Sequence, residues 1–386
     1  MKKLLFFFLV LISCQNRPVN KDKPDNIEII NLEKGYNKLK KVKLSEFVKS
    51  IDYIPLQSDS SCFIRRMNSH PENVEIVDNR IFIFDQRELL QFDIKGNFIN
   101  KIGKKGKGPG EYNNIQDFTV IPDMDMVAIF SPSTQKLLLY SYNNEFIRSF
   151  KVKTWPIGLY SKNQELYFFS CKGRRDLTDF KAFSVYDLNG NLLKNFLSRD
   201  FEKEISKDGV IGLNSMHLRY LYHDTLSFWE FQYDTLYRFT DDYHAIPRFV
   251  ITEGSNKLPI KTILEKNIKL RLSLKFAVLF RFIETDNYFL FESANKNRRA
   301  RLFYNKNTKD IVQVEYKENN KLFQKFYNDI DSMLPLWPLG RIDDNRLWTY
   351  FYPSKLKDKD MSHIDILNSC SKEPTDNPVI VVLNLK

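Results

Sequence analysis

The chain has 386 residues and a formal net charge of +11, and it contains 32 Phe and 19 Tyr but only 13 Gly. Aromatic residues at this abundance favour β-strands and supply ample material for a hydrophobic core. The composition therefore excludes a disordered or low-complexity chain and indicates a folded, strand-rich protein.

The first residues have the form of a bacterial export signal. Lys2 and Lys3 precede an unbroken apolar run from Leu4 to Ile12, which is too short to span a bilayer. The following Leu11-Ile12-Ser13-Cys14 resembles the lipobox of bacterial lipoproteins, in which the cysteine becomes the lipidated first residue of the mature chain. The alternative is an N-terminal strand with a chance cysteine. We expect a signal peptide over residues 1–13, membrane attachment through Cys14, and a periplasmic or cell-surface location.

The dispersed basic charges are not expected to serve nucleic acid, because an exported protein does not normally meet it. Residues 14–40 hold Asn, Lys, Asp and Pro with few large apolar residues before Ile27, which predicts a flexible tether. The folded part is expected to span residues 41–386. It begins with a strand-like run, Ile51–Leu56, that has no hairpin partner beside it.

Six central apolar runs recur along the chain at intervals of about 40 to 60 residues. They are Ile81–Phe84, Met126–Phe130, Leu166–Ser170, Thr225–Phe231, Tyr288–Glu292 and Arg346–Tyr350. A third run follows each of them, and in all units except the last a turn and a fourth run follow as well. Turn residues lie where hairpins need them, as in Asp187-Leu-Asn-Gly-Asn191.

The sixth unit lacks its fourth run because the chain ends at Lys386. The unpaired run Ile51–Leu56 is the missing piece, and its antiparallel pairing with Val379–Leu385 would remove two exposed sheet edges. The sequence thus predicts an all-β fold, a six-bladed β-propeller of four-stranded antiparallel blades whose closing blade is shared by N- and C-terminal strands. A β-sandwich is the alternative, but it explains neither the spacing nor the complementary ends.

Several motifs carry a family resemblance that spans about Lys41 to Lys386. The stretch Gly103-x-x-Gly106-x-Gly108-Pro-Gly-Glu-Tyr112 resembles an NHL-type propeller repeat. Three further sets of motifs together resemble the Bacteroides-type six-bladed β-propeller lipoprotein family. They are Leu44-Ser-Glu-Phe47 with Tyr53-Ile-Pro-Leu56, Asn328-Asp-Ile-Asp331 with Leu336-Trp-Pro338, and Asn377-Pro-Val-Ile-Val381. The chain departs from the family's usual Asp-Gly-Gly by having Asp331-Ser332-Met333, and the resemblance implies no established activity.

No motif indicates a cofactor or a metal. The glycine-rich Gly103–Gly110 lacks the Gly-Lys-Ser/Thr of a phosphate loop and leads into strands, so we interpret it as a turn between blades. The five histidines have no Cys or Glu at metal-ligand spacing, and no nucleophile elbow or calcium loop is present.

Candidate ligand-binding residues are those expected around the mouth of the central channel. Connectors between blades lie on the face where propellers usually bind, so the acidic and aromatic residues of these connectors are candidates, although they could equally pack and cap turns. His217 and Arg219 precede the fourth central run and could line the channel or be buried. The candidates are Asp329, Asp331, Trp337, Arg341, His217, Arg219 and Trp155.

The sequence also predicts helical inserts between blades and allows one disulfide. Pro259–Leu270 and Lys321–Met333 carry apolar residues at helical spacing, which predicts two small helical inserts. Cys62 and Cys370 leave the closing strand pair at the same end, so an oxidising compartment would permit a disulfide between them; all thiols free is the alternative.

Two functional classes remain open. The first is a non-enzymatic binding or assembly module that presents its mouth to a glycan, a peptide or an envelope protein. The second is a propeller hydrolase or lyase, which needs channel residues converging on a metal. No such constellation stands out at fixed spacing, so we favour binding.

The anchor can be tested directly. If Cys14 carries lipid, Cys14→Ser yields a soluble or unprocessed exported protein, because no acyl chain then holds it at the membrane. Fractionation of cells that produce either form measures this. Retention of the serine variant in the membrane fraction would contradict the prediction.

Overall fold

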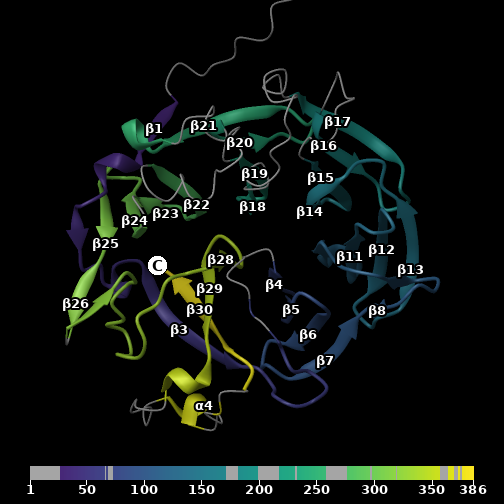
Figure 1. Ribbon diagram of the computed structural model, residues 1–386, viewed down its shortest axis with the longest axis horizontal. Coiled ribbons are helices and arrows are strands. Elements are labelled where there is room, and N and C mark those ends of the chain that lie inside the picture. The colour runs from purple at the N-terminus through teal and green to yellow at the C-terminus, as the bar shows by residue number, and fades with distance from the viewer. Residues whose placement is uncertain are drawn as a thin grey trace, which may run out of the picture.

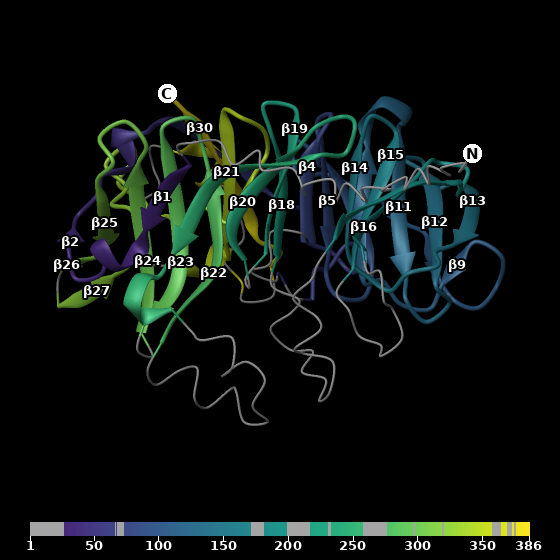
Figure 2. The ribbon, with the colours of Figure 1, turned by 90° about the horizontal axis from the view of Figure 1, so that it is seen from above.

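Six antiparallel sheets are arranged as blades around one axis, and together they form a closed ring (Figure 1). The computed structural model describes residues 27–65, 67, 73–170, 181–198, 217–230, 233–257, 276–295, 298–318, 320–356, 364–368, 373 and 376–386. Viewed from the side, the strands run across the thickness of the ring (Figure 2). The protein is a six-bladed β-propeller, which confirms the predicted fold.

The first three blades follow the chain from the innermost strand outward. Blade one comprises β4 (Val74–Val77), β5 (Arg80–Phe84), β6 (Leu89–Asp93) and β7 (Phe98–Ile102). Blade two comprises β10 (Asp117–Ile121), β11 (Met126–Ser131), β12 (Lys136–Ser141) and β13 (Phe146–Lys151). Blade three comprises β14 (Pro156–Lys162), β15 (Glu165–Ser170), β16 (Lys181–Tyr186) and β17 (Leu192–Ser198).

The other three blades follow the same order but include strands from the N-terminal segment. Blade four comprises β18 (His217–Tyr222), β19 (Thr225–Glu230), β20 (Tyr233–Phe239) and β21 (Ala245–Thr252). Blade five comprises β22 (Ala277–Glu284), β23 (Tyr288–Asn295), β24 (Arg298–Asn305) and β25 (Ile311–Val314). Blade six comprises β28 (Gly340–Arg341), β29 (Arg346–Phe351), β30 (Val379–Leu385) and β3 (Val48–Pro55).

Blade six closes the ring as the sequence predicted. The N-terminal strand β3 pairs antiparallel with the C-terminal strand β30, from Val48 opposite Leu385 to Pro55 opposite Val379. In Figure 1 the purple β3 lies beside the yellow β30. The two ends of the folded chain therefore share one sheet, and neither end leaves an unpaired edge in the ring.

The hairpins turn where the sequence supplies turn residues. Asp187 accepts hydrogen bonds from the amides of Asn189 (2.9 Å) and Asn191 (2.8 Å), and Gly190 takes a φ of +89°. Asp93 does the same for Lys95 and Asn97 ahead of β7. Aspartate caps the turn while glycine supplies the left-handed residue, so the two turns share one chemistry.

The core consists of six hydrophobic clusters, one between each pair of neighbouring blades. Phe82 and Phe118 represent the cluster between blades one and two, and Phe169 and Phe228 the cluster between blades three and four. Each sheet is therefore covered on both faces, which explains why the central strands are almost continuously apolar. The aromatic residues counted in the sequence fill these interfaces.

The glycine-rich segment Gly103–Gly110 joins blade one to blade two, as predicted. It contains β8 (Lys104–Lys105), which pairs in parallel with β9 (Glu111–Tyr112). Glu111 Oε2 accepts a hydrogen bond from the Gly108 amide at 2.8 Å. A Cβ at Gly106 would lie 1.9 Å from that same oxygen, so a side chain there would displace the Glu111 carboxylate.

The predicted tether over residues 14–40 is wrong in its C-terminal part. Strand β1 (Glu28–Asn31) pairs in parallel with β21, and β2 (Leu39–Lys40) pairs in parallel with β25, so each adds a fifth strand to a blade. Leu32 between them is completely buried. Residues 27–40 thus form an outer latch on blades four and five, while residues 14–26 lie outside the described residues.

The predicted helix at Lys321–Met333 is also wrong. Strand β27 (Lys321–Phe323) forms a hairpin with β26 (Tyr316–Glu318). Beyond it, Asn328 Oδ1 accepts from the Ile330 and Asp331 amides, which offers the backbone an alternative to helical bonding. Ser332 has a φ of +59°, so it takes the left-handed conformation at a position where the family pattern has glycine.

The second predicted helix, at Pro259–Leu270, lies outside the described residues. The described part of the chain has one short α-helix, α4 (Asp365–Asn368). No helix within the described residues is long and apolar enough to cross a bilayer.

The latch predicts different costs for two leucines within it. Leu32 is fully buried and Leu39 is 57% exposed. Leu32→Ala is expected to lower the free energy of unfolding by about 2–5 kcal/mol through lost burial and a cavity, whereas Leu39→Ala changes it by about 0.5 kcal/mol or less. Chemical denaturation of both variants measures the difference. Equal stability of the two would mean that residues 27–40 do not pack on the ring.

Candidate functional site

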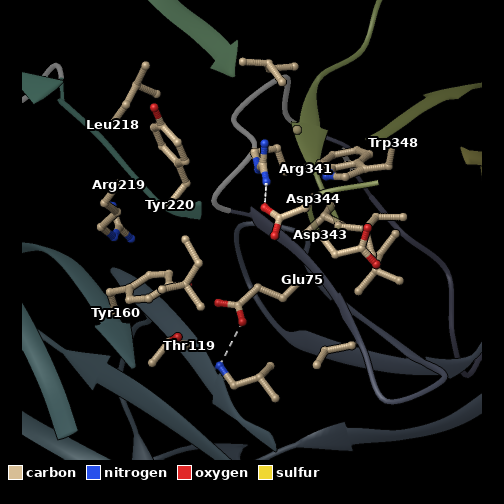
Figure 3. A pocket seen from close by; sticks show the side chains of 18 of the residues that line it. Glu75, Thr119, Tyr160, Leu218, Arg219, Tyr220, Arg341, Asp343, Asp344 and Trp348 are labelled. Carbon is tan, nitrogen blue, oxygen red and sulfur yellow. Dashed lines mark hydrogen bonds and ion pairs between the residues drawn. The ribbon is translucent and has the colours of Figure 1, made fainter. Parts of the chain in front are cut away.

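A cavity of about 420 Å³ lies on the ring axis, and the innermost strands of all six blades line it. Figure 3 shows it from close by, with polar side chains reaching in from several blades. Val77, Val120, Leu159, Leu221 and Phe282 are among its apolar lining residues. Apolar walls with a few polar groups are typical of small-molecule sites, and pockets of about 300–1,000 Å³ hold such ligands.

One polar network lies where the innermost strands begin. Asp117, the first residue of β10, forms an ion pair with Arg219 of β18, and both side chains are about nine-tenths covered. Arg219 also donates to the Leu159 carbonyl at 2.9 Å and contacts His217 Nε2 at 2.9 Å. A Cβ at Gly158 would lie 2.5 Å from His217 Nε2, so the missing side chain of β14 makes room for this network.

A second network surrounds Glu284, which is the last residue of β22 and is completely buried. Its carboxylate accepts from Arg248 (2.6 and 2.9 Å), Lys306 (2.7 Å) and Tyr220 (2.6 Å). Burial raises the pKa of Glu284, but the hydrogen bonds and charges of Arg248 and Lys306 outweigh it and hold the pKa below its ordinary value. The carboxylate is therefore ionised and fully engaged.

Arg341 connects that network to the turn that follows β28. It donates to the main-chain carbonyl of Glu284 and to Asp344 Oδ1 at 2.5 Å. Asp344 in turn lies 3.3 Å from His223 Nδ1, and His223 Nε2 lies 3.0 Å from Asp286. These turns between innermost and second strands lie at one end of the cavity.

Glu75 of β4 differs from the other acids of the cavity. Its carboxylate accepts a hydrogen bond from the Val120 amide at 3.0 Å and has no ion pair within the described residues. Burial raises the pKa of Glu75 to about 8; the Val120 hydrogen bond and the charge of Arg219 oppose the rise, and Asp117 adds to it. Glu75 keeps part of its surface open to the cavity, and Figure 3 shows its carboxylate pointing inward.

Of the residues singled out in the sequence, Arg219 and Arg341 line the cavity. His217 contacts Arg219 and packs on Phe169, with ring centroids 4.5 Å apart. Trp155 precedes β14 and is 51% exposed, outside the cavity lining. The sequence thus placed two of its candidates together and a third beside them.

Two of the other candidates, Asp329 and Asp331, hold the N-terminal segment on blades five and six. Asp329 accepts from Ser45 N (3.0 Å) and Ser45 Oγ (2.7 Å), and Asp331 accepts from the Tyr53 hydroxyl (2.7 Å). Burial raises the pKa of Asp329, but the hydrogen bonds from Ser45 outweigh it, so the pKa lies below its ordinary value. These carboxylates are engaged by the chain itself, away from the cavity.

Trp337 is 3% exposed and belongs to the core between blades five and six. It stacks on Phe326 with ring centroids 4.9 Å apart, and the Arg301 guanidinium lies 4.9 Å from its ring centroid. None of Asp329, Asp331 and Trp337 lines the cavity. Whether any of them binds a ligand stays a prediction.

The sequence interpretation missed Glu75, Tyr160, Tyr220 and Glu284. Each of these residues lies on the innermost strand of a blade, which precedes the central apolar run and is joined to it by a turn. That position was the one feature of the sequence that could have indicated them. Glu75 stands between Val74 and Ile76, which read as one short alternating strand. Its inward face becomes recognisable only when the blades are assigned.

One of the two cysteines of the predicted disulfide, Cys62, lies within the described residues. Cys62 is buried, and its Sγ lies 3.1 Å from the Gln57 carbonyl oxygen. Cys370 and Cys14 lie outside the described residues, so the Cys62–Cys370 bridge stays a prediction.

Among the described residues, no group of three or more His, Cys, Asp or Glu side chains is placed to hold a metal ion.

The chain matches the family model described as "Domain of unknown function (DUF4934)" over residues 27–384. The protein belongs to this family. The match begins one residue before β1, so it includes the latch. No curated protein matches the chain.

Two solved structures are similar to the protein. One is a protein of Bacteroides fragilis NCTC 9343 named as an exported protein, at 18% identity and a TM-score of 0.65, covering 87% of this chain and 95% of that chain. The other is a DUF4221 family member from Bacteroides vulgatus ATCC 8482, at 12% identity and a TM-score of 0.55, covering 88% and 97%. At these identities the likeness establishes the propeller fold alone.

The Asp117–Arg219 pair predicts a large effect of a small change. Asp117→Asn leaves the buried Arg219 guanidinium without its carboxylate and is expected to lower the free energy of unfolding by about 3–5 kcal/mol. Asp343→Asn breaks a half-exposed pair with Arg346 and is expected to change it by about 0–1 kcal/mol. Urea denaturation compares them. Equal effects would refute a structural role for the buried pair, and adding Arg219→Met to Asp117→Asn is expected to restore part of the loss.

Proposed function

We propose that the protein is an exported, lipid-anchored β-propeller of the cell envelope that binds a small ligand, or one projecting group of a glycan, peptide or envelope protein, in its axial cavity. The observation that carries the proposal is the cavity itself: about 420 Å³, walled by all six innermost strands, with apolar side chains interspersed with charged and hydroxyl groups from several blades. A preformed site of this kind binds without the cost of ordering loops.

The location rests on two supports. The N-terminal pattern of Lys2, Lys3, an apolar run and Cys14 supports export and lipid attachment. The structural likeness to a Bacteroides fragilis protein that is named as exported agrees with it. The described domain begins at residue 27, so the segment after Cys14 separates the proposed anchor from the ring.

Binding is favoured over a metal-dependent hydrolase or lyase. That alternative needs several metal-ligating side chains converging in the channel, whereas within the described residues no group of three or more His, Cys, Asp or Glu side chains is placed to hold a metal ion. Two of the carboxylates at the channel, Asp117 and Glu284, are engaged by arginine or lysine. The polar groups of the cavity are therefore better suited to hold a ligand than to activate water.

Filling the cavity tests the proposal. Val77 lines the cavity and is partly exposed, and it also packs on the core between blades one and two, so Val77→Trp is expected to narrow the cavity. Ile147→Trp adds the same ring on the outer strand β13, where Ile147 is 40% exposed, and is the matched control. A metabolite, glycan and peptide screen by thermal shift identifies ligands of the native protein.

The expected result is that Val77→Trp weakens binding of the screen's ligands at least tenfold, because the ring occupies their volume, while Ile147→Trp binds them normally. Calorimetric titration gives the dissociation constants. Ligands that bind both variants equally well would place the binding site outside the cavity and overturn the proposal.

A further inference from the structure

The charged side chains around the cavity are paired, with one partly buried exception. Arg219 is paired with Asp117, Arg341 with Asp344, and Asp343 with Arg346. Glu284 is matched by two cations, Arg248 and Lys306. Asp224 also lines the cavity but is exposed to solvent at its rim. Glu75 is the partly buried carboxylate of the cavity to which no cation is paired within the described residues.

The position of Glu75 suits an interaction with a ligand. The hydrogen bond from the Val120 amide fixes one carboxylate oxygen and leaves the carboxylate directed at the central space (Figure 3). Tyr160 reaches into the same space from β14 and Tyr220 from β18. Burial and the nearby Glu75 charge raise the pKa of Tyr160, so the ring is neutral beside the carboxylate. A carboxylate flanked by aromatic rings attracts cations by charge and through the ring faces.

We propose that Glu75 is the recognition residue of the cavity and that it selects a small organic ammonium ion carried on an apolar or aromatic stem. The inference rests on the proposed function, because it assumes that the cavity is the ligand site. The ammonium group would form an ion pair with the Glu75 carboxylate, and the stem would lie along Val77, Leu221 and Phe282.

An anionic ligand fits the cavity less well. The guanidinium of Arg219 already donates to Asp117 and to the Leu159 carbonyl, and that of Arg341 donates to Asp344 and to the Glu284 carbonyl. An anion would have to displace these partners, and it would meet Asp343, and Glu75 in its ionised form, as like charges. A cation meets instead a carboxylate that accepts hydrogen bonds from the Val120 amide and the Thr119 side chain but has no cation paired with it within the described residues.

Ligand binding should depend on pH in a defined direction. Glu75 is surrounded by ionisable and charged groups from the other innermost strands and the following turn: Asp117, Tyr160, Arg219, Tyr220, Glu284, Arg341, Asp343 and Asp344. Because the pKa of Glu75 is raised to about 8, the free carboxyl is mostly protonated below that pH. An ammonium ion needs the ionised form, so its affinity is expected to rise about tenfold per pH unit between pH 6 and 7 and to level off above 8.

The experiment uses three probes of one size and different charge: 2-phenylethylamine, 2-phenylethanol and 3-phenylpropanoate. Calorimetric titration of the full mature chain at pH 6, 7 and 8 gives their affinities. The amine is expected to bind at least tenfold more tightly than the alcohol at pH 8, and the carboxylate to bind most weakly. Glu75→Gln keeps the side-chain size and is expected to abolish both the preference for the amine and its pH dependence.

The matched control is Asp224→Asn, which removes a rim charge and is expected to leave the amine preference intact. If Glu75→Gln does not fold, as judged by thermal unfolding, the pH dependence of amine binding to the native protein decides alone. An amine preference that survives in Glu75→Gln, or equal binding of amine and alcohol by the native protein, overturns the inference.

The outcomes also separate this inference from the proposed function. Probes that bind regardless of charge, and that Val77→Trp excludes, would leave the cavity as the ligand site while removing the role of Glu75. Failure of all three probes at millimolar concentration overturns the cation inference. The proposed function also fails if the ligands found by the screen bind Val77→Trp normally.

Discussion

The pairing of β3 with β30 is the interaction on which the ring depends. It brings the N-terminal part of the domain to the last strand of the chain, from Val48 opposite Leu385 to Pro55 opposite Val379. The entropy of closing a loop grows only slowly with its length, so closure across the whole domain costs little more than closure of one blade. Without this pairing, two sheet edges and the clusters on both sides of blade six would open to solvent.

Side chains from the family-like motifs reinforce that closure. Ser45 bonds to Asp329 before β3 begins, and Tyr53 bonds to Asp331 within it. After β3, the buried Asn377 accepts from the Ile64 amide at 2.7 Å and donates to the Gln57 and Cys62 carbonyls. Polar groups buried at the seam are thus satisfied by partners distant in sequence, which specifies where the N-terminal segment lies.

What could be predicted from the sequence depended on how local its signal was. The blades follow from period-2 apolar runs and turn residues. The closure follows from the missing fourth strand of the last unit and the unpaired strand at the start of the domain. The latch was missed because parallel pairing along an outer edge uses backbone groups, and few buried side chains, Ile30, Leu32 and Tyr36, mark it. The false helix arose because apolar spacing at Phe323, Phe326 and Tyr327 also fits an irregular chain shaped by Asn328.

The sequence predicted only some of the residues that line the cavity. Arg219 and Arg341 were recognisable because they lie just ahead of strands expected at the mouth of the channel, whereas the carboxylate of Glu75 between Val74 and Ile76 reads as the solvent side of an edge strand. Only closure of the ring turns that side into the wall of a cavity. A residue is recognised in a sequence when its type or position differs from what its neighbours suggest. Glu75 does not differ in this way, and its place in the cavity becomes visible only in the folded ring.

The lack of a cation paired with Glu75 within the described part of the chain affects the free energy of folding. A partly buried carboxylate without a cation is costly, and because burial raises the pKa of Glu75 to about 8, the folded protein favours its protonated form at neutral pH. Because this pKa is raised, Glu75 favours folding below its unfolded-state value near 4.5 and loses that contribution as pH rises toward 8. A ligand that pairs with the ionised carboxylate would offset the cost in the native state alone, so occupancy of the cavity and stability of the ring are linked through one side chain.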